Sequence, residues 1–188
     1  MRRRKPASER VWVGSELLVK LAAALTPTLP STLAPMIVYG IDPGPKLHGW
    51  AILDVTLQKR VLLSAGRAST QEIIDQLGQQ QVQLVAIEWA SQVLGVGSIQ
   101  RVRAISKTLI ATQAEAGRLL QACETRGMKV VKISASDWRL GIVGTRSPTD
   151  KRVRESMGRL VTGAFPKEAG AHAYDAAGVA LAAFNRGR

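Results

Sequence analysis

Apolar and polar positions along the chain predict short strands first and an alternation of helices and strands afterwards. The segment 36–54, MIVYGIDPGPKLHGWAILD, holds two apolar runs rich in β-branched residues, separated by proline and glycine. This pattern predicts two strands joined by a tight turn. A further apolar run at 59–67 predicts a third strand after a short turn around Thr56. Three strands this close together indicate an antiparallel meander.

The remainder of the chain alternates expected helices with two more strands. Continuous apolar runs predict strands at 84–88 and 129–133. Helical periodicity predicts helices at 70–80, at 105–126, from Thr149 or Asp150 to about Thr162, and at 171–184, with a short helical turn at 134–140. Glycine and serine predict a mobile loop at 89–104 and a second loop at 141–148. The order predicts an α/β fold with a mixed five-stranded sheet, three strands antiparallel and two parallel, and helices on both faces.

Three acids in this pattern have apolar neighbours. Asp42 ends the first strand, Glu88 ends the fourth, and Asp175 lies near the start of the last helix, on the same face as His172. The first and fourth strands are expected side by side with their ends together, where converging carboxylates repel one another unless a divalent cation lies between them. Taken singly, Asp42 could cap a turn and His172 could be structural.

The composition of this set favours particular metals and a particular reaction. Hard oxygen ligands with one optional imidazole favour Mg²⁺, with Mn²⁺ as the other possibility. Two such ions are the usual machinery for hydrolysing a phosphodiester. The sequence therefore predicts a metal-dependent nuclease.

Charge and composition restrict the partner and the compartment. The chain has 188 residues, is 46% hydrophobic, and carries 26 Lys and Arg against 14 Asp and Glu, a net charge of +12. This charge favours a polyanionic partner, nucleic acid above all. The single cysteine, Cys123, excludes an internal disulfide framework and a cysteine-based zinc site, and it suits a reducing compartment such as the cytoplasm. No apolar run approaches the roughly 18 residues of a membrane span, so no membrane association is expected.

The first 35 residues differ in composition from the rest of the chain. They begin with MRRRKPASER and end with the linker-like TPTLPSTLAP. We therefore predict a basic, disordered extension and linker at 1–35 and a folded domain at 36–188. The extension holds six basic and two acidic residues, so +8 of the net +12 remains with the domain.

Four segments also resemble a known family. GIDPG at 40–44, AIE at 86–88, LGIVGTRSPTDKRV at 140–153 and AHAYDAAGVALA at 171–182 are similar to the RuvC family of Holliday-junction resolvases, within the ribonuclease H-like nucleases. The resemblance extends from Met36 to about Phe184. It implies a ribonuclease H-like fold and a Mg²⁺-dependent endodeoxyribonuclease that cuts four-way DNA junctions by paired symmetric nicks as a homodimer.

Carried over residue by residue, the resemblance assigns roles in the site. It implies metal binding and catalysis for Asp42, Glu88 and Asp175, and it places His172 where family members have Asp or His. Lys151 matches a basic residue near the scissile phosphate. The family often has an aromatic wedge shortly after the glutamate, and here only Trp89 is aromatic.

Basic residues near the presumed acids predict contacts with DNA phosphates, although such residues are often only a solvated face. Trp138 is expected in the core rather than as a platform for base stacking. The apolar face of the helix at 105–126 could pack on the sheet or form part of a dimer interface. The predicted DNA-binding residues are Trp89, Arg101, Arg103, Lys107, Arg139, Arg146, Lys151 and Arg152, with Arg154 as a further basic neighbour.

Two other functions remain open from the sequence. One is a ribonuclease H-like enzyme acting on structured RNA or an RNA–DNA hybrid with the same acids. The other is a non-catalytic module that binds nucleotide or nucleic acid on the same fold. A nucleotide site would need a further glycine-rich phosphate loop, and the one candidate, GVG at 95–97, has no neighbouring acid.

Overall fold

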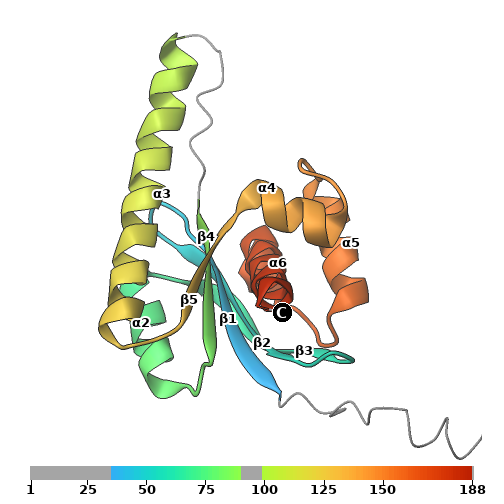
Figure 1. Cartoon of the computed structure of the whole chain (residues 1–188). Coiled ribbons are helices and arrows are strands. Elements are labelled where there is room, and N and C mark those ends of the chain that lie inside the picture. Colours follow the sequence, from blue (N-terminus) through green and yellow to red (C-terminus); the bar gives the residue numbers. More distant parts are fainter. Residues whose placement is uncertain (1–34, 90–98, 188) are drawn as a thin grey trace, which may run out of the picture. The chain divides into compact units, whose positions relative to one another are not determined.

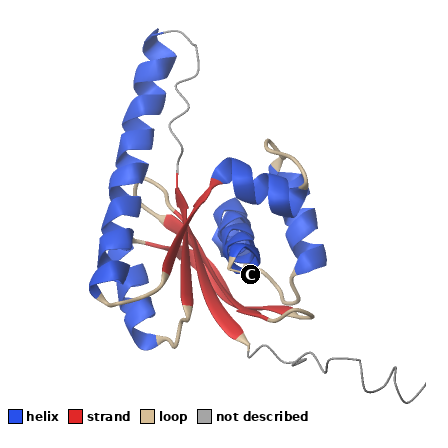
Figure 2. Cartoon of the chain, viewed as in Figure 1, coloured by secondary structure: helices blue, strands red, loops and turns tan. Residues whose placement is uncertain are grey.

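A mixed five-stranded sheet forms the centre of the structure, a computed structural model that describes residues 35–89 and 99–187, with the backbone alone for 99–106. The strand order is β3-β2-β1-β4-β5 (Figures 1 and 2). β1 pairs antiparallel with β2, and β2 with β3, whereas β1–β4 and β4–β5 are parallel. The predicted meander followed by two parallel strands is confirmed. The strands are β1 Met36–Asp42, β2 His48–Val55, β3 Arg60–Ala68, β4 Leu84–Trp89 and β5 Val130–Ser134.

Helices cover both faces of the sheet, as the sequence predicts. α2 and α3 lie on one face, and α6 packs on the other with α4 and α5 beside it (Figure 1). The helices are α2 Thr70–Gln79, α3 Ile99–Thr125, α4 Ala135–Trp138, α5 Asp150–Leu160 and α6 Gly170–Arg186, with short helical turns η1 Arg139–Val143 and η2 Lys167–Ala169. In the part of the chain that the structure describes, none of these helices combines the length and apolarity needed to cross a bilayer.

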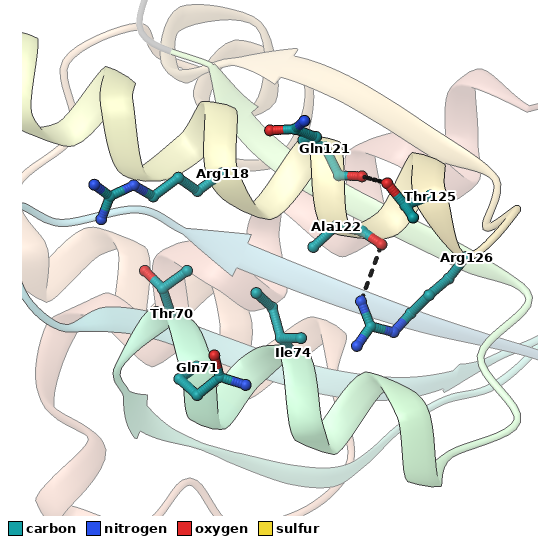
Figure 3. Close-up of a pocket in the computed structure, with 8 residues that line it drawn as sticks. All are labelled: Thr70, Gln71, Ile74, Arg118, Gln121, Ala122, Thr125 and Arg126. Carbon is teal, nitrogen blue, oxygen red and sulfur yellow. Dashed lines mark hydrogen bonds between the residues drawn. The ribbon is translucent and has the colours of Figure 1, made fainter.

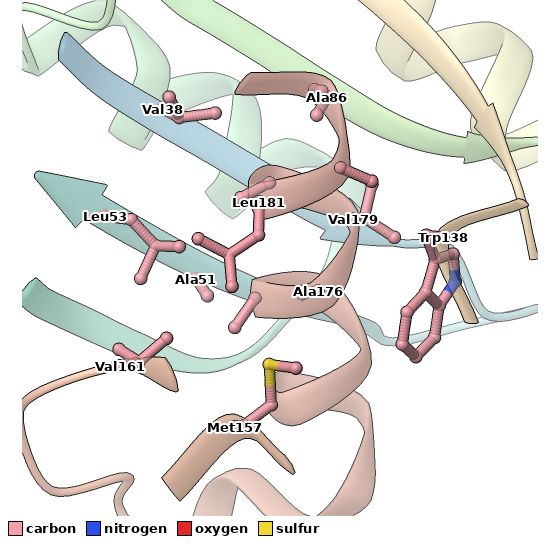
Figure 4. Close-up of a cluster of buried hydrophobic side chains, with 14 of the residues drawn as sticks. Val38, Ala51, Leu53, Ala86, Trp138, Met157, Val161, Ala176, Val179 and Leu181 are labelled. Carbon is pink, nitrogen blue, oxygen red and sulfur yellow. The ribbon is translucent and has the colours of Figure 1, made fainter. Parts of the chain in front are cut away.

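Side chains of the central strands alternate between two apolar clusters. Val38 of β1 and Ala86 of β4 belong to the cluster under α6 (Figure 4), whereas Tyr39 and Ile41 belong to the cluster under α2 and α3. Because successive side chains in a strand point to opposite faces, the residue that ends β1, Asp42, falls on the α6 face. Glu88, two positions after Ala86, falls on the same face. The alternation therefore directs both acids toward α6.

Two glycines let α6 lie directly on the sheet. A Cβ atom at Gly40 would overlap the carbonyl oxygen of Ala176, and one at Gly49 would overlap the carbonyl oxygen of His172. Only glycine permits this approach of backbone to backbone. The alanine-rich side of α6 completes the contact with side chains that are small enough to fit. The first turns of α6 are thereby held against the ends of β1 and β2.

The structure corrects the expected start of the long helix. We predicted a loop at 89–104 and a helix at 105–126, but α3 begins at Ile99 and ends at Thr125. Residues 99–104 hold no glycine or proline and are compatible with helix, so the helix extends further toward its N-terminus than its apolar face suggests. Residues 90–98 of the predicted loop lie outside the described residues, as does the predicted extension, apart from residue 35.

A second correction concerns the segment after β5. Instead of a short turn and a glycine loop, α4 continues into the π-helical turn η1, which includes Gly141. The chain leaves this turn at Gly144, whose φ of 81° is left-handed and favours glycine. At its N-terminus α2 is capped by Ser69, which forms a capping box with Glu72.

Candidate metal centre

Three potential metal ligands meet where α6 crosses the ends of β1 and β2. One ligand atom from each of Asp42, His172 and Asp175 can be chosen so that all three lie within 4.8 Å of one another. Nδ1 of His172 is 2.6 Å from Oδ2 of Asp42. Asp42 is only 8% exposed, whereas about half of the His172 side chain faces solvent. The group is therefore fixed at the strand end and open on the helix side.

The local sequence explains this convergence. Asp42 pairs with Gly49 at the end of the β1–β2 ladder, and Gly49 lies against the backbone of His172. Asp175 follows one helical turn later on the same side of α6, because residues three apart share a helix face. The predicted i, i+3 pair thus faces the predicted strand-end acid. The hydrogen bond to Asp42 is the main reason why the pKa of His172 is raised above its ordinary value.

Glu88 is close to this group but is held separately. Its Oε2 accepts a hydrogen bond of 2.7 Å from the indole Nε1 of Trp138, a fully buried residue in α4. Burial, together with the charge of Asp42, raises the pKa of Glu88 to about 7, and the hydrogen bond from Trp138 opposes this shift. Trp138 is a core residue as predicted, but its contact with Glu88 was missed because nothing in the sequence links two residues so far apart.

Arg139 brings a positive charge to the site, next to Asp175. Nη2 of Arg139, at the start of η1, lies 3.9 Å from Oδ2 of Asp175, and the guanidinium also stands over the ring of Trp138. Burial and then the charge of Asp42 raise the pKa of Asp175 to about 6, despite Arg139. Arg139 was predicted only as a DNA-binding residue, and its place beside the acids, where α4 continues into η1, is a tertiary contact that the sequence did not reveal.

The chemistry of these residues fits a divalent cation. Three carboxylates share one small region, and burial first, then the charge of Asp42, raises the pKa values of Glu88 and Asp175. Arg139 is the cation that contacts Asp175 among the described ion pairs, at the long distance of 3.9 Å. A hard divalent ion would relieve this repulsion, and oxygen donors with one imidazole are ligands that such ions accept.

The other predicted site residues are more scattered. Lys151 is 86% exposed and pairs only loosely with Glu155, at 3.9 Å, in α5. Trp89 is partly buried on the α2–α3 side, with Nζ of Lys132 4.7 Å from its ring centroid. Exposed positions are occupied by Lys107 at the described end of α3, Arg146 after η1, and Arg152 and Arg154 in α5. The side chains of Arg101 and Arg103 lie outside the described residues.

One basic residue near the centre was not singled out from the sequence. Arg67 of β3 pairs with Gly49, which itself lies under His172, and the charge of Arg67 acts to lower the pKa of His172. Its side chain is exposed. The strand pairing that brings it there was predictable in outline, but its register was not.

Comparison with known structures gives the fold. Thermus thermophilus RuvC in complex with a Holliday junction substrate is similar at 18% identity and a TM-score of 0.63, over 80% of this chain and 94% of that one. A second structure of Thermus thermophilus RuvC has 20% identity and a TM-score of 0.59, over 80% and 95%. The yeast mitochondrial Holliday junction resolvase Ydc2 has 13% identity and a TM-score of 0.51, over 89% and 86%. No family model and no curated protein matches the sequence.

These likenesses show the fold, which is ribonuclease H-like. Within that fold the neighbours are RuvC and Ydc2, and the resemblance to RuvC resolvases that the sequence indicated is confirmed in the fold. At identities of 20% or less, the activity of this chain has to be argued from its own residues.

Proposed function

We propose that this protein is a metal-dependent, structure-selective endonuclease that resolves four-way DNA junctions. The observation that carries the proposal is the convergence of Asp42, His172 and Asp175 within 4.8 Å, with Glu88 alongside, at one end of a basic domain. The fold that places these residues is shared with solved structures of Holliday junction resolvases, one of them in complex with its substrate.

The four residues would hold Mg²⁺ or Mn²⁺. When bound, such ions activate a water molecule and stabilise the leaving oxygen of a phosphodiester. Asp42 supplies a carboxylate fixed by the strand end, and Asp175 supplies one from α6. Glu88 presents one oxygen while Trp138 holds the other. His172, half exposed, can release Asp42 and turn its imidazole toward the ligand set.

The basic residues around the centre would bind the phosphate backbone. Arg139 stands beside Asp175, so its guanidinium can contact a phosphate that approaches the acids. Lys151, Arg146 and Arg152 are exposed and can make further phosphate contacts. Trp89 at the end of β4 and Lys107 in α3 extend this proposed DNA-binding surface. Arg101 and Arg103, whose side chains lie outside the described residues, stay predicted phosphate contacts.

Paired nicks require two active sites, and the described part of each chain has one such group. A homodimer with two-fold symmetry would place two centres on strands related by the symmetry of the junction. α3 offers a surface for this contact, because Ile110 on it is 66% exposed.

A cytoplasmic location rests on cysteine usage alone and stays a prediction.

The test compares nicking of a mobile four-way junction, a linear duplex, an RNA–DNA hybrid and a structured RNA, with and without Mg²⁺. Wild-type protein should cut the junction with paired symmetric nicks and need no nucleotide. Asp42→Asn and Asp175→Asn should abolish nicking and retain junction binding, because phosphate contacts lie elsewhere. Asp54→Asn is the matched control, since Asp54 lies at the far end of the β1–β2 ladder.

Each alternative outcome has a definite meaning. Preferred cleavage of the hybrid or the RNA would show that the same site acts in RNA processing. If the protein binds nucleic acid but cleaves none of the substrates with any metal ion, it is a non-catalytic binding module. Wild-type nicking by Asp42→Asn or Asp175→Asn would show that the metal centre is assigned to the wrong residues.

A further inference from the structure

A series of polar contacts runs beneath the turn that follows Asp42. The backbone N–H of Gly44 donates to Nδ1 of His48 at 3.1 Å, and Nε2 of His48 is 2.8 Å from the hydroxyl of Thr70. The Thr70 hydroxyl in turn donates to Oε2 of Glu115. The series therefore joins the β1–β2 turn to the start of α2 and to the middle of α3.

The direction of these hydrogen bonds follows from the protonation of His48. This side chain is fully buried, and burial lowers its pKa below the ordinary value, which favours the neutral imidazole. Because Nδ1 accepts from Gly44, the proton of the neutral ring resides on Nε2 and is donated to Thr70. Thr70 then has its own proton for Glu115, whose other oxygen accepts from Arg118 at 2.9 Å. The four hydrogen bonds thus form one consistent set, with no donor facing another donor.

The position of these contacts connects them with the metal centre although the two groups do not touch. His48 faces α2 and α3, whereas the acids face α6 on the other side of the sheet. Gly44, however, is two residues after Asp42, and Gly49, which pairs with Asp42, directly follows His48. Holding Gly44 and His48 therefore fixes both backbone segments that orient the Asp42 carboxylate.

We propose that His48, Thr70 and Glu115 are positioning residues for Asp42, and that they hold its strand-end turn in the orientation needed to bind a metal ion. The proposal rests on the metal centre described under the proposed function. Contacts with only a structural role would stabilise the fold and leave the affinity of the centre for metal unchanged.

Thr70 is the best position for a test, because its hydroxyl joins His48 to Glu115 in the middle of this series of contacts. Together with Arg118 it lines an open pocket of about 500 Å³ between α2 and α3 (Figure 3). Substitution by valine removes the hydroxyl and keeps the shape, whereas serine keeps the hydroxyl and loses a methyl group. Thr70→Val and Thr70→Ser therefore form a matched pair that separates hydrogen bonding from packing.

The first measurement is Mn²⁺ affinity of the full chain without DNA, by titration calorimetry. We expect Thr70→Val to bind Mn²⁺ about tenfold more weakly, the lower end of the range for outer partners of metal ligands, and Thr70→Ser to bind as the wild type does. Glu115→Gln, which keeps an acceptor for Thr70, should show a smaller loss. Thermal melting establishes that each variant is folded at the temperature of the titration.

Two further readouts identify the mechanism. Nitrogen NMR of the imidazole should show the Nε2–H tautomer of His48, and the Gly44 amide should exchange faster in Thr70→Val. On a four-way junction, Thr70→Val should lower the nicking rate at limiting metal and leave the dissociation constant for DNA unchanged.

The outcomes separate this proposal from the proposed function. A wild-type protein that binds Mn²⁺ but cuts no junction would refute the function and leave the affinities of the variants as the test of positioning. Equal Mn²⁺ affinity of Thr70→Val and wild type would overturn the positioning role, whatever the nuclease activity. Absence of Mn²⁺ binding by the wild type would overturn the metal centre and the positioning role together.

Discussion

Replacing Trp138 with phenylalanine tests how the buried glutamate of the site is held. In the structure, the indole N–H donates to Oε2 of Glu88 at 2.7 Å. Phenylalanine keeps an aromatic ring in the core but has no donor. Glu88 would then keep its buried position, with one oxygen deprived of the hydrogen bond that the structure shows.

The size of the effect follows from this one hydrogen bond, which both orients the carboxylate and favours its charged form. A hydrogen bond to an ionised group is worth about 1.5–3 kcal/mol, which corresponds to roughly tenfold to hundredfold in an equilibrium constant. The same hydrogen bond acts to lower the pKa of Glu88, which already stands at about 7. Without this hydrogen bond the pKa of Glu88 rises further. At neutral pH a larger fraction of the molecules then has a protonated Glu88, which must lose its proton before it binds a metal. Metal affinity should therefore fall by at least about tenfold.

The assay is a titration of Mn²⁺ into the free protein, followed by nicking of a four-way junction across the same metal range. Trp50→Phe is the matched control: Trp50 stacks on Tyr39 on the other face of the sheet, and its Nε1 has no hydrogen-bond partner among the described residues. It loses the same indole group without touching an acid. If Trp138→Phe and Trp50→Phe have the same metal affinity as the wild type, Trp138 does not position Glu88.

Two more predictions concern pH and packing. The pKa values of Glu88 and Asp175 are raised to about 7 and about 6. Acids with a raised pKa stabilise the metal-free fold at low pH and lose that contribution as pH rises through these values. The increase in melting temperature on adding Mg²⁺ should therefore be small near pH 5 and larger near pH 8, and an increase that does not change with pH would contradict the assignment. Gly40→Ala should lower the melting temperature strongly, because the added Cβ would overlap the Ala176 carbonyl oxygen. Gly158→Ala in α5 is the control and should raise the melting temperature slightly, because a Cβ there would have nothing within 4 Å. Equal melting temperatures of the two variants would show that α6 can move away from β1.

Much of the framework could be predicted from the sequence because it depends on local periodicity. Apolar runs of strand length and the punctuation by proline and glycine identify all five strands of the described sheet, within one or two residues at most ends. The position of Asp42 and Glu88 at the ends of such runs, and the spacing of His172 and Asp175, are also local properties. Parallel pairing of β1 with β4 then follows from chain order, so the meeting of these residues was foreseeable.

The sequence did not reveal where some helices begin and end, nor which side chains contact each other across the fold. α3 begins six residues earlier than its apolar face suggests, because helix formation there needs no buried stripe. Gly141 is helical because α4 continues into a π turn, and the sequence did not reveal that Arg139, where the two helical segments join, lies beside Asp175.

The polar contacts that hold the site were decided by tertiary structure alone. Trp138 reaches Glu88 across 50 positions of sequence, and Thr70 reaches Glu115 across 45. A tryptophan or a threonine has no periodic signature that distinguishes a partner of a distant carboxylate from an ordinary core or helix-start residue. Such pairs form because packing α4 and α6 on one face, and α2 and α3 on the other, leaves these polar groups partly buried, where hydrogen bonding to one another replaces hydrogen bonding to water.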